Sequence, residues 1–352
     1  NLLISVLFLM GIQSTFFGPN KYSILPQVLK EEKELMEGTA LVEMGTFLAI
    51  LLGTILGGVL LNYSTTLLCI SIFLCSVLGY FSSLGIPPVS VSDSSLKIKL
   101  NPLSQVSSSL KVSLQNRSVV FGILSISWFW FLGAVYLSQI PVFVKYFMNA
   151  EKVFVSILLS VFTFSLAIGS IFCNKLSQKV IELGLVPIGC VGMALFGFDL
   201  LFIDYSVFKE PLMTVAQSFQ GLYLPVCTRL VIDFFFVGFF GSFYIVPVYA
   251  ILQKRSSKEN CSQVIASNNI LNAIFMIFSA LSTMAAYKLG YKTNQIFAGV
   301  SVLNLIFLVI FISFMPELIY RTKFWLKKRL GSYPVVKGHD ILRISNLVVV
   351  PN

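Results

Sequence analysis

The stretch FFGPNKYSILPQVLKEEKELMEGTALVEMGTFLAILLGTILGG, residues 16–58, decides the fold. It starts in the last turns of one apolar run, passes through a short charged segment and enters a second apolar run at 38–61. That second run exceeds the roughly 20 residues that a helix needs to cross ~30 Å of hydrocarbon. Two such runs around a charged turn predict two membrane-spanning helices that meet at one membrane surface.

The same pattern continues along the chain. Of the 352 residues, 56% are hydrophobic and 11% are charged, against about a quarter charged in an average globular protein. The apolar runs lack the alternation of barrel strands, and backbone groups in lipid must be bonded internally, so the runs are expected to be helices. Nine spans are expected, at about 1–18, 38–61, 65–84, 118–140, 153–173, 184–205, 228–251, 264–286 and 294–314.

Several classes of function are disfavoured. His339 is the only histidine, the six cysteines form no CxxC, and no P-loop occurs. We therefore expect no metal, no cofactor and no ATP-driven pump, and we interpret the cysteines as small apolar residues of a bundle. The first run lacks the basic region and the cleavage site of a signal peptide.

The basic residues predict the orientation. Nineteen of the 25 Lys and Arg residues fall in one set of alternate loops and in the tail after 316. Because basic residues near helix ends stay cytoplasmic, this set and the C-terminus are expected in the cytoplasm. The formal charge of +10 is then a topology signal and an attraction to anionic lipid, so no nucleic-acid partner is expected.

A second stretch repeats the first. Residues 239–282 again carry Phe-Phe-Gly, a tyrosine and a proline at a helix end, then a charged turn and a long helix. An offset of about 223 residues is typical of two parallel six-helix halves of a major facilitator transporter. This register predicts that three helices precede the chain. It divides the chain into a partial N-terminal half (1–84), a cytoplasmic linker (85–117), a six-helix C-terminal half (118–316) and a cytoplasmic tail (317–352).

Four segments also resemble a known family. FGPNKYSILPQ (17–27), EGTALVEMGTFLAILLGTILGG (37–58), KLSQKVIELGLVPIGCVGMALFGFDL (175–200) and residues 241–275 are similar to bacterial lysophospholipid transporters of the major facilitator type. The resemblance implies an all-α protein of the bacterial inner membrane that moves a lysophosphatidylethanolamine-type lipid by alternating access. Membrane lipid and this substrate are the implied partners.

The tail resembles a segment that joins a transporter to a following domain. Residues 315–352 are similar to the segment that leads, in one version of this family, into a glycerophospholipid acyltransferase and an acyl-carrier-protein synthetase. The chain ends before the family's His-x4-Asp motif, and His339 does not fit it. The chain itself is therefore not expected to be an enzyme, and it is expected to be truncated at both ends relative to the family.

Two charged residues of the first stretch are candidate substrate ligands. Glu43 lies about one turn inside its helix, where it would pair with the lipid ammonium or a proton; the alternative is an interfacial carboxylate paired with Lys33 or a neighbouring lysine. Lys21 follows a Gly-Pro break and would meet the phosphate or Glu43, unless it is an ordinary flanking lysine. Tyr244, the tyrosine of the second stretch, is a further candidate.

A polar stripe lies in the helix at 264–286. It would line the cavity and bind a head group, or it would join helices through hydrogen bonds. The stripe consists of Asn269, Asn272, Ser279 and Thr283, with Asn268 beside it.

Two acidic residues lie in the C-terminal half. Asp233 follows Arg229 by four residues, which predicts a local ion pair. Asp199 has no local partner and is expected in an interhelical hydrogen bond or in ion coupling, for which Asp233 is a second candidate. Close helix packing of the GxxxG kind is expected at Gly53, Gly57 and Gly58.

Three other functions stay open. The chain could be a major facilitator efflux carrier for another substrate, or the membrane anchor of a bifunctional acyltransferase and acyl-carrier-protein ligase. It could also be a degraded gene product without activity.

Overall fold

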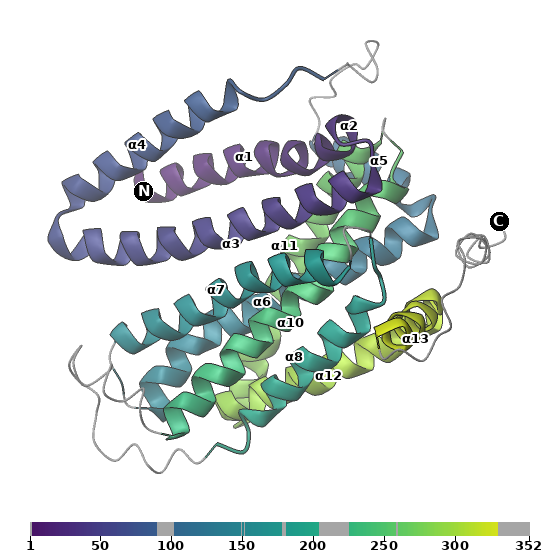
Figure 1. The fold of residues 1–352 in the computed structure, drawn as a ribbon. Helices are drawn as coiled ribbons and strands as arrows, with labels where there is room; N and C mark the ends of the chain where they lie inside the picture. The colour runs from purple at the N-terminus through teal and green to yellow at the C-terminus, as the bar shows by residue number, and fades with distance from the viewer. Residues whose placement is uncertain are drawn as a thin grey trace.

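The structure is a computed structural model that describes residues 2–89, 102–148, 150, 152–177, 181–203, 225–257 and 260–329. The expected linker lies partly outside these ranges. The tail after 329, which includes His339, lies wholly outside them. The described elements are helices joined by turns (Figure 1).

The N-terminal part contains three long helices. α1 (Leu2–Ser23) keeps Pro19 inside it, and the single turn α2 (Leu25–Val28) leads into the 32-residue α3 (Glu32–Tyr63). Glu32 and Glu34 lie in the first turn of α3, where acidic side chains stabilise the helix dipole. Ser64 then caps α4 (Thr65–Ser83) by accepting a hydrogen bond from the Thr66 amide.

The C-terminal part is a bundle around α10. Its helices are α6 (Arg117–Phe147), α7 (Lys152–Leu176), α8 (Leu185–Asp199), α10 (Pro225–Arg255), α11 (Cys261–Lys288) and α12 (Thr293–Phe314). The central helix α10 packs against α6, α7 and α8. Two shorter helices flank the bundle: α5 (Pro102–Leu114) packs against α11, and α13 (Glu317–Arg329) packs against α8.

Glycine permits the closest helix contacts in this bundle. A Cβ on Gly189 of α8 would lie 2.7 Å from the backbone nitrogen of Tyr244 in α10. A Cβ on Gly238 of α10 would collide with the Ser165 hydroxyl and the Phe162 carbonyl of α7. Aromatic rings fill the neighbouring space, with the Tyr136 and Phe297 rings stacked at 5.2 Å.

The expected all-α polytopic class is confirmed. Each of the nine predicted runs is helical, and seven described helices are long and apolar enough to cross a membrane. The prediction for 184–205 was too long, because α8 stops at Asp199 after 15 residues. The prediction for 38–61 was too short, because α3 begins six residues earlier, at Glu32.

The glycine prediction for α3 is wrong at two positions. A Cβ on Gly53 or Gly57 would meet no described atom within 4 Å, because this half of α3 diverges from the bundle. The surroundings of Gly58 lie outside the described part of the chain. Close glycine contacts occur instead inside the C-terminal bundle, at Gly38 near the start of α3 and at Gly18 of α1.

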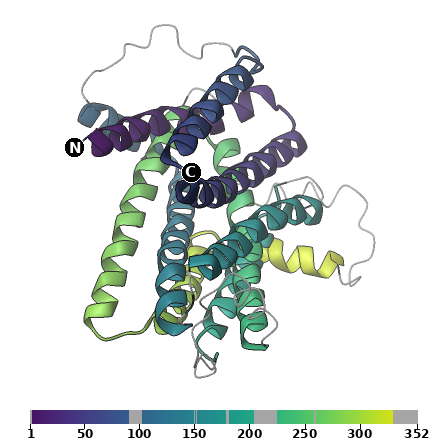
Figure 2. The same cartoon turned by 90° about the vertical axis from the view of Figure 1, so that its left-hand side faces the viewer.

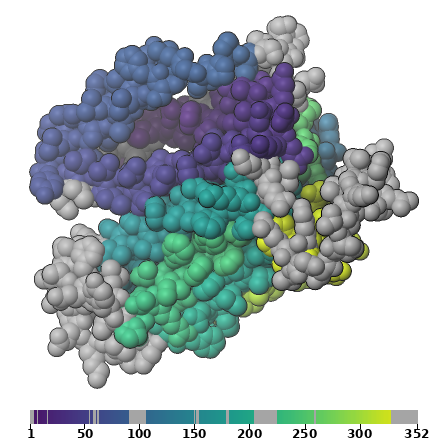
Figure 3. All heavy atoms as spheres, viewed as in Figure 1, coloured from purple at the N-terminus to yellow at the C-terminus, as the bar shows by residue number. Residues whose placement is uncertain are grey.

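The two parts converge at one end of the molecule and diverge at the other. We call the end that holds α2, α5 and α13 the α2 end, and the opposite end the far end (Figure 1). α3 packs against α7, and α1 packs against α11 (Figures 1 and 2). The space-filling view shows a notch between the two parts toward the far end (Figure 3).

Candidate functional site

A buried carboxylate lies where the two parts meet. Glu43 of α3 is 1% exposed, and its Oε1 accepts a hydrogen bond of 2.7 Å from the Tyr22 hydroxyl of α1. Burying an ionisable group at membrane depth is unfavourable unless a partner or a ligand compensates for it. The alternative of an exposed interfacial carboxylate is therefore wrong, because helices of both parts cover Glu43, and the lysine within electrostatic reach is Lys21, not Lys33.

A cation lies beside this carboxylate. Lys21 Nζ donates to the Thr46 hydroxyl at 2.9 Å and sits 4.6 Å from the centre of the Tyr22 ring. It is half-buried and within electrostatic reach of Glu43. Lys21, Glu43 and Thr46 thus form one polar cluster between α1 and α3, with both signs of charge.

The C-terminal part adds aromatic groups to the cluster. The Tyr249 ring of α10 stacks on Tyr22 with centroids 4.6 Å apart and planes 3° apart. Trp130 of α6 donates its indole N–H to the Tyr249 hydroxyl at 3.3 Å. Sequence reasoning did not select Tyr22, Tyr249 or Trp130, although both tyrosines lie within a few residues of the proline in their repeated stretch.

The polar residues of the α11 stripe differ in what they contact. Asn268 is fully buried, and its amide makes no hydrogen bond of regular geometry among the described residues, although it interacts with the nearby Tyr249 hydroxyl. Asn269 faces Gly18 of α1, since its amide nitrogen lies 2.8 Å from where a Cβ of Gly18 would be. Asn272 accepts a hydrogen bond of 2.9 Å from Ser127 of α6.

The far part of the stripe lies inside the bundle. Ser279 and Thr283 are buried and donate to carbonyl oxygens of their own helix. Asn269 faces α1, and Asn268 and Asn272 lie close to Tyr249 of α10, so these three residues reach the junction. Asn272 joins α11 to α6, as the alternative of polar contacts between helices predicted.

An apolar cavity continues from the polar cluster. Phe47, one turn beyond Glu43, and Ile50 line it from α3, and Trp130 lines it from α6. The remaining lining residues come from α6, α7, α8 and α10: Phe129, Gly133, Tyr136, Leu137, Phe162, Thr163, Leu166, Met193, Val237 and Gly241. Charged groups and hydrocarbon walls therefore adjoin each other, an arrangement that suits an amphiphile.

Tyr244 lies apart from the cluster. It is 1% exposed, its hydroxyl donates to the Ser125 carbonyl at 2.8 Å, and its ring stacks on Phe129. These contacts hold α10 against α6 within the C-terminal bundle.

The acidic residues of the C-terminal half form a separate group. Arg229 makes two hydrogen bonds to Asp199, Nε to Oδ2 at 2.8 Å and Nη2 to Oδ1 at 2.6 Å. The expected local pair of Arg229 with Asp233 is therefore wrong, because the end of α8 brings Asp199 into the better geometry. Asp233 is 2% exposed, and its Oδ2 has no hydrogen-bond partner within the described ranges, although Asp199 lies close.

Polar contacts close the α2 end. Lys254 of α10 forms an ion pair with Glu32 of α3, and Glu32 also accepts a hydrogen bond from the Ile181 amide at 3.2 Å. Nearby, Thr39 donates to Gln253 Oε1 at 3.3 Å. Together these contacts form a clasp between α3 and the bundle.

Comparison with known proteins agrees with this architecture. Residues 1–233 match the family model of the Major Facilitator Superfamily. A protein of an Enterobacter species named lysophospholipid transporter LplT is 24% identical over 303 residues, which cover 84% of this chain and 68% of that protein. Its namesake from Cronobacter sakazakii is 22% identical over 302 residues, or 83% and 68% of the two chains. The Citrobacter koseri protein of the same name is 24% identical over 284 residues, covering 79% of this chain and 65% of its own.

Proposed function

The chain belongs to the Major Facilitator Superfamily, and we propose that it moves a lysophospholipid across the membrane by alternating access. The substrate class rests on one observation: a cluster with both signs of charge, Lys21 and Glu43, adjoins an apolar cavity between the two parts. The relatives named lysophospholipid transporter support the same choice.

The chemistry of the cluster matches a lysophosphatidylethanolamine. Its phosphate would bind the Lys21 ammonium, and its ammonium would bind the Glu43 carboxylate. The buried amide of Asn268, which makes no hydrogen bond of regular geometry among the described residues, would serve the glycerol hydroxyl. The single acyl chain would lie along the apolar side chains beside Phe47 and Trp130, where the cavity measures about 30 Å³ and would have to widen to hold it.

The asymmetry between the two ends suggests which way the site opens. The clasp of Glu32 and Lys254 holds the α2 end closed, whereas the two parts diverge at the far end. Release at the α2 end would require the clasp to open while the far end closes. This is the alternation that a two-half transporter performs around a fixed site.

We further propose a multi-pass location in a bacterial inner membrane, with the C-terminus in the cytoplasm. The support is the nineteen-to-six division of basic residues in the sequence, because those of the richer set that the structure describes lie at the α2 end. Reporter fusions after residues 30, 177, 257 and 335 should be cytoplasmic. Fusions after 63, 148 and 290 should be external, and an external signal after 177 or 335 would reverse the orientation.

Uptake of labelled lysophosphatidylethanolamine into vesicles that contain the protein tests the function. Glu43→Gln and Lys21→Ala should each lower uptake at least about tenfold, the effect of losing one charged hydrogen bond in a buried site. Matched controls are Glu34→Gln and Lys30→Ala, which change exposed charges nearby. Normal uptake in both site variants would move the head-group site to Asn269 and Asn272. Transport of an unrelated solute without lysophospholipid uptake would favour another carrier function.

A further inference from the structure

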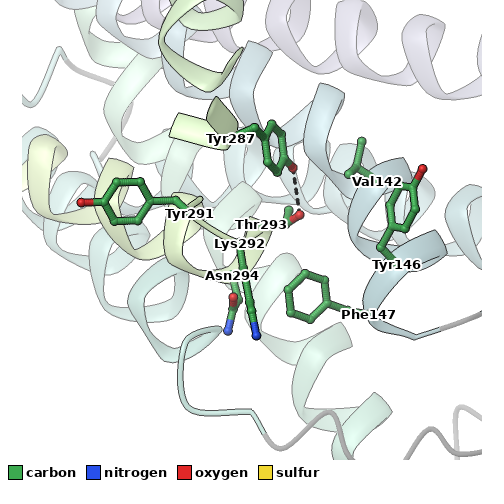
Figure 4. Close-up of a pocket in the computed structure, with 8 residues that line it drawn as sticks. All are labelled: Val142, Tyr146, Phe147, Tyr287, Tyr291, Lys292, Thr293 and Asn294. Atoms are coloured by element: carbon green, nitrogen blue, oxygen red, sulfur yellow. Dashed lines mark hydrogen bonds between the residues drawn. The ribbon is translucent and has the colours of Figure 1, made fainter. Parts of the chain in front are cut away.

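A second cavity lies at the far end of the C-terminal bundle, away from the polar cluster. It measures about 820 Å³ and lies where α6 and α11 end and α12 begins. Figure 4 shows its lining side chains, which are Val142, Tyr146, Phe147, Tyr287, Tyr291, Lys292, Thr293 and Asn294. Its volume is within the range of ligand sites for small molecules, roughly 300–1,000 Å³.

Hydrogen bonds across three helices fix one wall of this cavity. The Tyr287 hydroxyl at the end of α11 donates to Gln139 Oε1 of α6. It also lies 2.9 Å from the Thr293 hydroxyl at the start of α12 (Figure 4). Gln139 and Thr293 are both buried, so this wall is held by the bundle and is not a mobile surface feature.

The turn between α11 and α12 forms the rim of the cavity. The Gly290 amide bonds the Tyr287 carbonyl and the Tyr291 amide bonds the Ala286 carbonyl, both at 3.0 Å. This is a Schellman motif, which needs a left-handed residue, and Gly290 supplies it with φ of 87°. The motif ends α11 sharply and presents Tyr291 and Lys292 at the mouth.

The lining residues form a polar side and an apolar side. Lys292 and Asn294 carry their nitrogen atoms on the same side of the cavity in Figure 4, close to the first turn of α12. Val142 and Phe147 provide an apolar wall from α6, and Tyr146 beside them is largely exposed. None of the lining residues is acidic. A cation, an amide and a helix N-terminus favour an anion, and the α6 wall favours a hydrocarbon chain.

We propose that this cavity binds a phosphate-bearing amphiphile at the far end of the protein, before the molecule enters between the two parts. The phosphate contacts Lys292 and Asn294, and the first carbons of the acyl chain lie along Val142 and Phe147. The identity of the amphiphile as the transported lysophospholipid rests on the function proposed above. A resident two-chain phospholipid has the same phosphate chemistry, and the test below separates the two sources.

The test is photolabelling of the intact protein in vesicles. A lysophosphatidylethanolamine with a diazirine near the start of its acyl chain is added from outside in the cold, and labelled peptides are identified by mass spectrometry. Label is expected in peptides that contain 142–147 and 287–294. Lys292→Gln should lower it about tenfold, as expected for the loss of one charged hydrogen bond, and Lys292→Arg should retain it. Lys288→Gln is the matched control, because Lys288 is exposed in the same turn but does not line the cavity.

Competition identifies the source of the ligand. Unlabelled lysophosphatidylethanolamine should compete, whereas a monoacylglycerol without phosphate should not. Equal competition by phosphatidylglycerol would assign the cavity to a resident lipid of the same chemistry. Absence of label from these peptides, or equal labelling of Lys292→Gln, would overturn the proposal.

The two proposals fail separately. Glu43→Gln should lower uptake at least about tenfold and leave the photolabelling intact. Normal uptake without label in the cavity would reject the cavity and keep the transport function. Label in the cavity without uptake by the wild type would keep the cavity and reject the function.

Discussion

Tyr22 and Tyr249 lie face to face with 4.6 Å between ring centres, and this stack joins α1 to α10 where the Tyr22 hydroxyl binds the buried Glu43. One tyrosine belongs to each of the two repeated stretches. The pair therefore links the two parts of the protein at the point where the proposed head-group site is assembled.

The Tyr22 hydroxyl is expected to stabilise the Glu43 carboxylate. Tyr22→Phe keeps the stack but leaves a buried acceptor without its donor, so the free energy of unfolding should fall by about 1–3 kcal/mol. Thermal unfolding in detergent measures this, with exposed Tyr63→Phe as the control. In the double variant with Glu43→Gln the two effects should not add; full additivity would show that the hydroxyl and the carboxylate act independently.

The clasp at the α2 end should be weak. The Glu32 and Lys254 side chains are 38% and 47% exposed, and ion pairs of this kind contribute about 0.2–1 kcal/mol. Lys254→Gln should therefore raise the population open at the α2 end by about twofold to fivefold. Distances between spin labels at positions 34 and 257 report that population. The charge swap Glu32→Lys with Lys254→Glu should recover the ion pair but not the hydrogen bond from the Ile181 amide, so it should restore the closed population only in part. Exposed Lys33→Gln should leave the population unchanged.

Gly238 should not tolerate a side chain. Gly238→Ala places a methyl group against Ser165 and the backbone of α7, which should reduce stability by about 1–3 kcal/mol through overpacking. Gly53→Ala is the matched control, because it meets open space and should stabilise the helix by about 0.5–1 kcal/mol. Similar unfolding temperatures for the two variants would contradict the close approach of α10 and α7.

Asp233 is expected to be the coupling residue of its group if an ion drives transport. Arg229 neutralises Asp199, whereas Asp233 is buried with one oxygen unbonded among the described residues. Asp233→Asn should remove any stimulation of uptake by an imposed proton gradient, and Asp199→Asn should retain it. Stimulation that survives in Asp233→Asn would exclude this residue from coupling.

The sequence predicted the helices better than their contacts. Apolar runs and charged turns identified the nine long helices of the described ranges, because hydrocarbon thickness sets a length that is visible in the sequence. The pairing of Arg229 was predicted wrongly, because a neighbour four residues away is visible in sequence and Asp199, thirty residues away, is not. α5 and α13 were not predicted, since their amphipathic segments are shorter and more polar than a membrane span.

The candidate site was likewise predicted in its residues better than in its tertiary contacts. Lys21 and Glu43 stood out because ionisable residues are rare in apolar runs, and the structure places them in one cluster. Tyr249 and Trp130 did not stand out, because aromatic residues are common along this chain and only tertiary contact distinguishes these two. Tyr244 was selected through the repeat, yet its hydroxyl bonds Ser125 inside the bundle.

Trp130 lies at the boundary between the polar cluster and the apolar cavity. Its indole nitrogen bonds Tyr249 of the polar cluster, and its ring lines the apolar cavity. Indole emission shifts with local polarity and hydrogen bonding, so this one side chain is a built-in optical probe of occupancy. The chain has only two other tryptophans, Trp128 and Trp325, and neither lines that cavity. A single-tryptophan protein would therefore report the arrival of an acyl chain by its own fluorescence, without any attached dye.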